Sequence, residues 1–256
     1  MTIEYSEICE QGLSPEENQD SVFCASDDGV GLFVVADGMG GHFGGSAASG
    51  MVVKLLGEWW KKYISATVSL TGDYSDTGYS GIKEVLSSAN DLIRNANPGV
   101  VTGSTAVVLY LEDNRYSVLS CGDSRCYRVT RKLFGTEEIC ITTDDVWEND
   151  PLIRNSMSED EIRNHRNFGK LIRAVGTERD FSCTGVSGEL NENCLFMLCS
   201  DGVYKYADEK KVSGVLRKAL DKSSDLDFCL GKLKEYVYQA GAPDNFSAVL
   251  VRVLPQ

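Results

Sequence analysis

Short runs of β-branched and aromatic residues recur along this 256-residue chain, and each run is bounded by Gly, Asp, Asn or Ser. This pattern is typical of β-strands. The runs on either side of the sequence DNR should pair antiparallel, because so short a connection favours a hairpin. The predicted strands comprise residues 21–25, 30–37, 104–111, 116–121, 126–129, 138–142, 182–189, 194–200 and 247–254.

Apolar residues at helical spacing predict four helices. Between Met51 and Trp60 they form one stripe at positions i, i+3, i+4, i+7 and i+8, as one buried helix face requires. The predicted helices comprise residues 46–64, 82–96, 208–220 and 226–240. Residues 65–79 are polar and contain Gly, which favours a loop. Residues 143–167 are charged and resemble a surface insertion with a short helix near 158–165.

The order of these elements limits the fold class. Two helices come early, two come late, and strands follow one another between them, which does not suit a βαβ repeat. The order favours an α+β fold with a central β-sandwich of antiparallel sheets and helices on its outer faces. A chain of this length can form one large domain, residues 1–256, and needs no disulfides to fold.

Composition narrows the functional classes. Apolar residues make up 42% and charged residues 25% of the chain, an ordinary globular profile. No apolar stretch approaches the ~20 residues of a membrane span, and the acidic start lacks the apolar core of a secretory signal. The net charge of −13 without a basic cluster argues against nucleic-acid binding. This acid excess is either a solvated surface or in part a cation site, and composition leaves both open.

The cysteines and histidines argue against a zinc site. The nine cysteines form no CxxC pair and lie mostly in apolar runs, where Cys behaves as a small hydrophobe. A reducing cytoplasm is the simplest setting for such a chain. The only histidines are His42 and His165, too few for a standard zinc site.

Five aspartates lie at the ends of predicted strands: Asp20, Asp37, Asp123, Asp201 and Asp244. A single Asp in such a place is usually a turn residue, because its side chain bonds nearby backbone amides. Acids at the ends of neighbouring strands can, however, meet at one edge of a sandwich, and their repulsion is then relieved by a hard cation. Ligands that are all oxygen point to Mg²⁺ or Mn²⁺, and Gly38 would let its carbonyl approach such a cation. Strand spacing alone leaves the turn and metal interpretations about even.

Ordered motifs favour the metal site. The segments ENQDSVF, VVADGMGGHFGGSAAS, GSTAVVLYL, LSCGDSRCYRV, LIRAVGT, LFMLCSDGVYKY and APDNFSAVLVRV resemble, in the same order, the metal-dependent Ser/Thr protein phosphatases of the PPM or type-2C family. The resemblance covers residues ~10 to 253, and DGMGGH is similar to the bacterial branch. It implies a four-layer α-β-β-α sandwich, with residues 143–167 as a flap.

The resemblance also implies site residues. Asp37, the Gly38 carbonyl, Asp201 and Asp244 would hold two Mn²⁺ or Mg²⁺ ions that share a hydroxide, and this hydroxide attacks the phosphorus. Asp20 matches an acid that supports the metals through water, and Asp123 matches one that joins Asp201 in holding a third, weaker metal. Two-metal chemistry of this kind needs no phosphoenzyme.

The chain also departs from the family pattern. Pro15 stands where most members carry an Arg that grips the substrate phosphate, a contact worth roughly 1.5–3 kcal/mol. Gln19 replaces a frequent Glu, and the flap begins TTDDVWENDP without the common DHS signature. His42 either donates a proton to the leaving oxygen or only supports the Gly-rich turn.

Three functions follow as hypotheses. The first is a monomeric cytoplasmic phosphatase acting on phosphorylated proteins, the substrates of a Ser/Thr kinase, with no nucleic-acid or membrane partner. The second, motivated by Pro15, is a phosphoprotein-binding regulatory module with little turnover. The third is a hydrolase of small phosphoesters.

Overall fold

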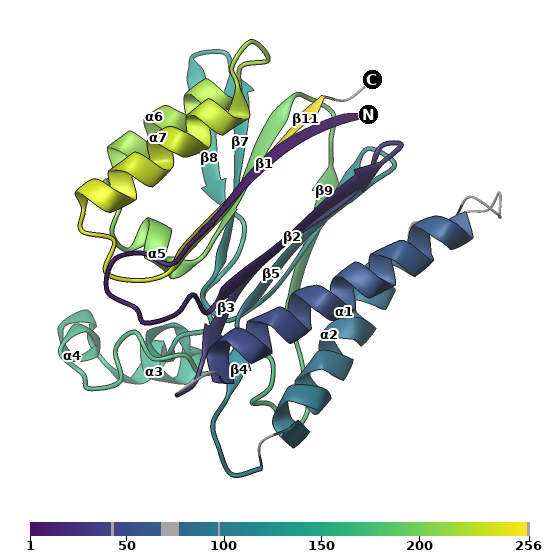
Figure 1. Cartoon of the computed structure of the whole chain (residues 1–256). Coiled ribbons are helices and arrows are strands. Elements are labelled where there is room, and N and C mark those ends of the chain that lie inside the picture. Colours follow the sequence, from purple (N-terminus) through teal and green to yellow (C-terminus); the bar gives the residue numbers. More distant parts are fainter. Residues whose placement is uncertain (42–43, 68–76, 97, 255–256) are drawn as a thin grey trace.

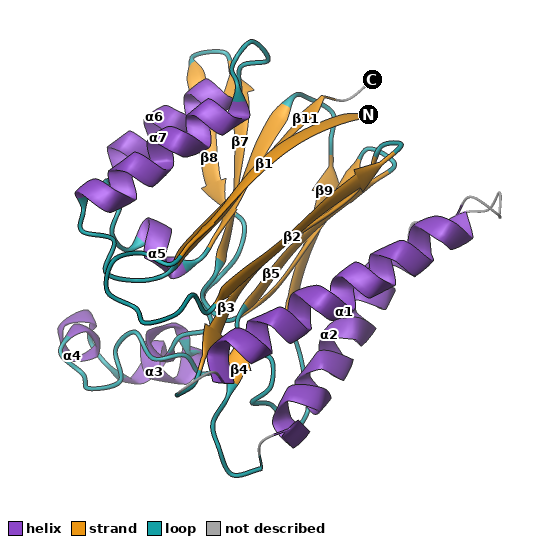
Figure 2. Cartoon of the chain, in the orientation of Figure 1, coloured by secondary structure: helices purple, strands orange, loops and turns teal. Residues whose placement is uncertain are grey.

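The computed structural model describes residues 1–41, 44–67, 77–96 and 98–254. Two antiparallel β-sheets pack face to face, and helices cover the outer face of each sheet (Figures 1 and 2). The predicted α-β-β-α sandwich is therefore confirmed.

The two sheets have five strands along their main paths. The first runs in the order β1 (Thr2–Glu10), β11 (Phe246–Leu254), β10 (Cys194–Cys199), β7 (Arg125–Lys132) and β8 (Gly135–Cys140). The second runs in the order β2 (Asp20–Asp27), β3 (Val30–Met39), β5 (Ala106–Glu112), β6 (Arg115–Cys121) and β9 (Thr184–Glu189), and β4 (Gly103–Ser104) pairs with the end of β3.

Two pairs of long helices enclose the sheets. Helices α1 (Gly44–Thr67) and α2 (Thr77–Ala96) cover the second sheet, and α6 (Glu209–Ala219) and α7 (Leu226–Gln239) cover the first (Figure 1). Residues 143–167 contain a 3-10 turn, η1 (Trp147–Asn149), and two short helices, α3 (Pro151–Ser156) and α4 (Glu159–Arg163). These lie at the end of the sandwich that is remote from both chain termini (Figure 1).

Alternation along the central strands divides the interior into three apolar layers. In β3, Leu32 and Val34 pack under α1 and α2, whereas Phe33 and Val35 face the other sheet. Strand β10 does the same, with Met197 facing α6 and α7 and Phe196 facing the second sheet. Both faces of each central strand are thus buried, which fixes the strand register, because a slip of one residue would exchange the two faces.

The hairpin predicted at DNR is present. Glu112 and Arg115 are paired across β5 and β6, which leaves Asp113 and Asn114 as the two turn residues. Their φ angles are 49° and 56°, and a positive φ at both positions is the signature of a type I′ turn. Asp and Asn tolerate this conformation better than other non-glycine residues.

Several sequence predictions need correction. Helix α1 continues to Thr67 and α2 begins at Thr77, so both ends of the predicted loop 65–79 are helical; residues 68–76 lie outside the described residues. Strand β1 was not predicted, because Ile3 faces the layer between the sheets and Ile8 the layer under α7, so no single alternation marks it. The short helices α3 and α5 (Asp201–Tyr204) were also missed.

Arg252 joins three parts of the first sheet and its helical layer. It lies in β11 with 4% of its surface exposed. Its Nη1 is within hydrogen-bond distance of the carbonyl oxygens of Ala219 and Ser224, at 3.0 Å each. Its Nε donates to Glu4 of β1 at 2.6 Å. The guanidinium therefore ties the segment between α6 and α7 to the sheet.

We predict that Arg252→Met lowers the free energy of unfolding by about 2–4 kcal/mol, because it leaves buried carbonyl oxygens without a donor. Urea unfolding of the purified protein measures this. Arg131→Met is the matched control, since Arg131 is 63% exposed and pairs with Asp221 at 3.5 Å; it should change stability by less than about 0.5 kcal/mol. Equal effects of the two substitutions would contradict the assigned role of Arg252.

Candidate active site

The five strand-end aspartates lie at one end of the sandwich, beside the segment that carries α3 and α4. Asp20 begins β2 and is paired directly with Asp37 of β3. Asp123 follows β6, Asp201 follows β10 and begins α5, and Asp244 precedes β11. The second sheet thus supplies Asp20, Asp37 and Asp123, and the first supplies Asp201 and Asp244. The structure brings all five predicted acids to a common edge.

The charges of these acids act on one another. Burial raises the pKa of Asp37 well above its usual range, and the charges of Asp20, Asp201, Asp123 and Asp244 raise it further. Burial and the charge of Asp201 likewise raise the pKa of Asp244. Carboxylates this close favour protonation or a neutralising cation.

Asp20 is one of the two buried members of the cluster, with 5% of its surface exposed against 4% for Asp123. Its Oδ2 accepts a hydrogen bond from the Ser200 hydroxyl at 2.7 Å, and Ser200 Oγ in turn accepts from the Ser247 amide at 2.9 Å. Its Oδ1 has no hydrogen-bond partner among the described residues. Burial raises the pKa of Asp20 to about 7, and the charges of Asp201 and Asp244 add to this, while the hydrogen bond from Ser200 opposes it.

The backbone of Asp37 is clamped on both sides by Thr105. The Asp37 amide donates to Thr105 Oγ1 at 2.9 Å, and the Asp37 carbonyl accepts from the Thr105 amide at 2.8 Å. Thr105 Oγ1 also shares a hydrogen bond with Ser124 Oγ at 2.7 Å. Ser124 is adjacent to Asp123, so the clamp fixes Asp37 and the GDSR segment relative to each other.

The glycines that follow Asp37 and Asp201 allow close backbone contacts. A Cβ on Gly38 would lie 2.1 Å from the Gly45 carbonyl oxygen, and one on Gly202 would lie 1.9 Å from the Asn245 carbonyl oxygen. Neither distance is possible for a real side chain, so both positions require Gly. The two Asp-Gly pairs therefore hold their aspartates against a neighbouring segment, a reason that the sequence pattern did not reveal.

Asn245 connects the last strand to the N-terminal loop. Its Oδ1 accepts from the Gln19 amide at 2.9 Å, and its Nδ2 donates to the carbonyls of Gln11 and Glu17 at 2.7 and 3.0 Å. This fixes the loop that carries Pro15, whose carbonyl accepts from Gln11 Nε2 at 2.8 Å. The Gln19 side chain donates to Glu17 at 2.9 Å.

One cation lies within the acid cluster. Lys205 Nζ is 2.5 Å from Asp201 Oδ2 and 3.3 Å from Asp123 Oδ2. Burial disfavours the ammonium, but hydrogen bonds and charge from Asp201 and Asp123 outweigh burial and raise the pKa of Lys205. The Tyr204 hydroxyl donates to the Asp123 carbonyl at 3.0 Å, so consecutive residues of one short segment hold Asp123.

Two aspartates of the TTDD sequence anchor the predicted flap to the site. Asp144 accepts from Arg125 at 2.7 Å. Asp145 pairs with Arg173 and accepts from the Gly122 amide at 2.9 Å, next to Asp123. Farther along the segment, the rings of Trp147 and His165 stack with centroids 4.1 Å apart. Asp144 and Asp145 thus anchor the start of this segment, which lacks the common DHS signature.

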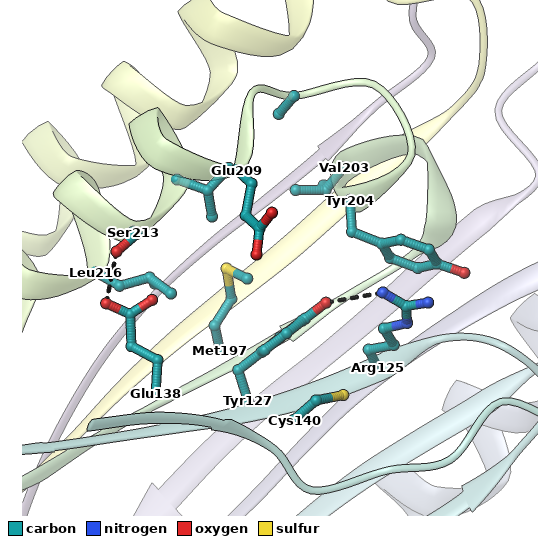
Figure 3. A pocket seen from close by; sticks show the side chains of 12 residues that line it. Arg125, Tyr127, Glu138, Cys140, Met197, Val203, Tyr204, Glu209, Ser213 and Leu216 are labelled. Atoms are coloured by element: carbon teal, nitrogen blue, oxygen red, sulfur yellow. Dashed lines mark hydrogen bonds between the residues drawn. The ribbon is translucent and has the colours of Figure 1, made fainter.

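A cavity of about 430 Å³ lies between β7, β8, α5 and α6 (Figure 3). Arg125 and Tyr204 form one end of it, with the guanidinium 3.6 Å from the centre of the Tyr204 ring. Met197 and Leu216 form part of its apolar lining. The cavity and the cluster therefore share Tyr204 as a wall.

The donor set fits a hard divalent cation. It consists of carboxylates without a described imidazole or thiol among them, and it includes the unpartnered Asp20 Oδ1. Within the described parts of the chain, no three Asp, Glu, His or Cys side chains are already arranged around one point as metal ligands. Rotation of the partly exposed carboxylates would be needed to bind a metal. His42 lies outside the described residues.

The family relationship agrees with this geometry. The family model described as protein phosphatase 2C matches residues 14–235, and the chain belongs to this family. A serine/threonine phosphatase stp of Listeria monocytogenes is 27% identical over 230 residues, 88% of this chain and 85% of the relative. PstP of Mycobacterium tuberculosis is 23% identical over 99% of this chain and 46% of the relative.

Solved structures share the fold over nearly the full chain. PppA of Pseudomonas aeruginosa, described as a regulatory component of T6SS, has a TM-score of 0.78 and 28% identity, with 99% of each chain covered. The S. agalactiae serine/threonine phosphatase has a TM-score of 0.81 and 22% identity, covering 99% of this chain and 100% of that one. The PstP catalytic domain, solved with two manganese ions, has a TM-score of 0.75, 23% identity and 99% coverage of both chains.

Sequence reasoning missed four residues that shape the site: Ser200, Asn245, Lys205 and Thr105. Asn245 and Ser200 stand next to predicted acids in PDN and CSDG, which is a signal that could have found them. Lys205 lies four residues after Asp201, a spacing that places two side chains on one helix face. Nothing in the sequence marks Thr105 as the partner of Asp37.

We predict that metal-free protein loses stability as pH rises from 4 to about 7. Because the pKa of Asp20 is raised from 3.8 to about 7, the folded state binds more protons than the unfolded state in this window, and the free energy of unfolding falls with pH. Asp20→Asn should reduce this slope, whereas Asp180→Asn at an exposed position should not. Urea unfolding in EDTA across the range measures the slopes, and equal slopes for wild type and Asp20→Asn would contradict the assignment.

Proposed function

We propose that this chain is a metal-dependent protein phosphatase that hydrolyses phosphoserine and phosphothreonine, with Mn²⁺ or Mg²⁺ as its cofactor. The observation that carries the proposal is the convergence of five carboxylates from both sheets at one edge. Family membership and relatives named serine/threonine phosphatases support the reaction class.

The residues proposed to hold two metal ions are Asp37, the Gly38 carbonyl, Asp201 and Asp244. Asp20 supports them through water, since its Oδ1 is buried and has no described partner. When bound, the divalent ions lower the pKa of coordinated water and neutralise charge on the phosphoryl oxygens. The protein's own contribution is positional: Thr105 fixes Asp37, Ser200 orients Asp20, and Asn245 fixes the segment next to Asp244.

The proposed substrates are phosphorylated proteins that a Ser/Thr kinase supplies. Pro15 offers no charge to the substrate phosphate, so we assign the main attraction for phosphate to the metal ions. The segment anchored by Asp144 and Asp145 carries α3 and α4 beside the end of β3 (Figure 1), and Asp145 contacts the Gly122 amide next to Asp123. We propose that this segment contacts the protein part of the substrate.

We further propose one catalytic domain, residues 1–256 with a flap at about 143–167, acting as a monomer in the cytoplasm. All nine cysteines are described and none is bonded to another, which supports a reducing compartment. No described helix is long and apolar enough to cross a membrane. Size-exclusion chromatography with light scattering measures the oligomeric state.

Two other activities remain as alternatives. Pro15 favours a phosphoprotein-binding module with low turnover, because the phosphate lacks one charge-assisted contact. A hydrolase of small phosphoesters would use the same metals. Comparing kcat/KM for phosphoserine and phosphothreonine peptides with that for p-nitrophenyl phosphate distinguishes the three: a preference for the peptides supports the proposal.

We predict that Asp37→Asn and Asp201→Asn each reduce Mn²⁺-dependent kcat/KM on a phosphothreonine peptide by about 100-fold or more, because both substitutions remove a charge needed to hold metal. Asp180→Asn, an exposed acid elsewhere, should retain wild-type activity. A steady-state assay with and without EDTA measures this. Activity that persists in EDTA, or survives both substitutions, would place the reaction elsewhere.

A further inference from the structure

Lys205 holds an unusual position among the lysines of the chain. Its ammonium lies between two carboxylates that come from separate elements, Asp201 at the start of α5 and Asp123 after β6. Lys232 and Lys234, by comparison, each pair with one carboxylate on the surface. Lys205 therefore links the two sheets at the acid cluster.

An ordinary helix-surface ion pair does not account for this arrangement. The Asp201–Lys205 spacing of four residues would suffice for such a pair, but it would not involve Asp123. The Asp123 side chain is only 6% exposed, and that of Asp201 is 17% exposed. A cation shared by two enclosed carboxylates occupies the place where a divalent ion bridging the same pair would bind.

Charge balance is consistent with this role. The cluster carries five carboxylates. Two divalent cations would offset four of these charges, and the ammonium of Lys205 offsets the fifth. A further divalent ion between Asp123 and Asp201 would have to displace Lys205 or lie against it, and two cations in contact repel.

Resting on the proposed two-metal function, we infer that Lys205 is a built-in replacement for a third metal ion. Its ammonium fills the site between Asp123 and Asp201, so the chain binds two divalent ions and not three. Asp123 then acts as the partner of Lys205 and not as a metal ligand. Lys205 is a positioning residue, because it acts through Asp201.

The test is the number of Mn²⁺ ions bound per chain, measured by equilibrium dialysis with elemental analysis and by calorimetric titration. Wild type should bind two. Lys205→Met, which keeps an unbranched side chain one atom shorter and removes its charge, should bind three, the additional ion more weakly. Adding Asp123→Asn to Lys205→Met should return the count to two. Lys232→Met is the matched control and should bind two.

Asp123→Asn in the wild-type background covers the case in which Lys205→Met fails to fold, and it should leave the count at two. Loss of one ion in this variant, or an unchanged count in folded Lys205→Met, would overturn the inference. An unchanged count with a raised KM would assign Lys205 to the substrate phosphate instead. Wild type that binds no Mn²⁺ would contradict the proposed function. The inference is judged separately, by whether Lys205→Met binds one Mn²⁺ ion more than wild type.

Discussion

The repulsion among five carboxylates at the common edge of two sheets is the constraint on which the site depends. Burial strengthens this repulsion, because less water is available to screen the charges. The fold tolerates it since the acids lie at strand ends, outside the three apolar layers that stabilise the sandwich. One ammonium, that of Lys205, offsets part of the charge within the protein. We propose that divalent cations offset the remainder.

Rigid backbone contacts keep the acids together despite their charges. Gly38 and Gly202 let neighbouring segments approach to distances that no Cβ allows. Ser200 links β2, β10 and β11 through its two hydrogen bonds, and Asn245 fixes the N-terminal loop. Such contacts fix the backbone of the proposed ligands, so that cation binding would require only side-chain rotation. This pre-organisation is what a two-metal phosphatase needs for its reaction geometry.

The sequence predicted the layers of the fold and the acids of the site, because both depend on local patterns. The central strands bury both faces and are rich in β-branched residues, and the long helices carry regular apolar stripes. It did not predict β1, whose partly buried apolar residues Ile3 and Ile8 fall on opposite faces. It also did not predict the Ser200–Asp20 hydrogen bond or the Lys205–Asp123 pair, whose partners are 180 and 82 residues apart. Contacts of this kind depend on how the two sheets meet, which no local pattern encodes.

A crystal structure of the protein with Mn²⁺, located by anomalous scattering, tests the central claim most directly. We expect two ions at the shared edge, with Asp37, the Gly38 carbonyl, Asp201 and Asp244 as ligands and the Lys205 ammonium still between Asp123 and Asp201. Ions bound elsewhere, or an edge that stays free of metal at saturating Mn²⁺ while the enzyme is active, would contradict it.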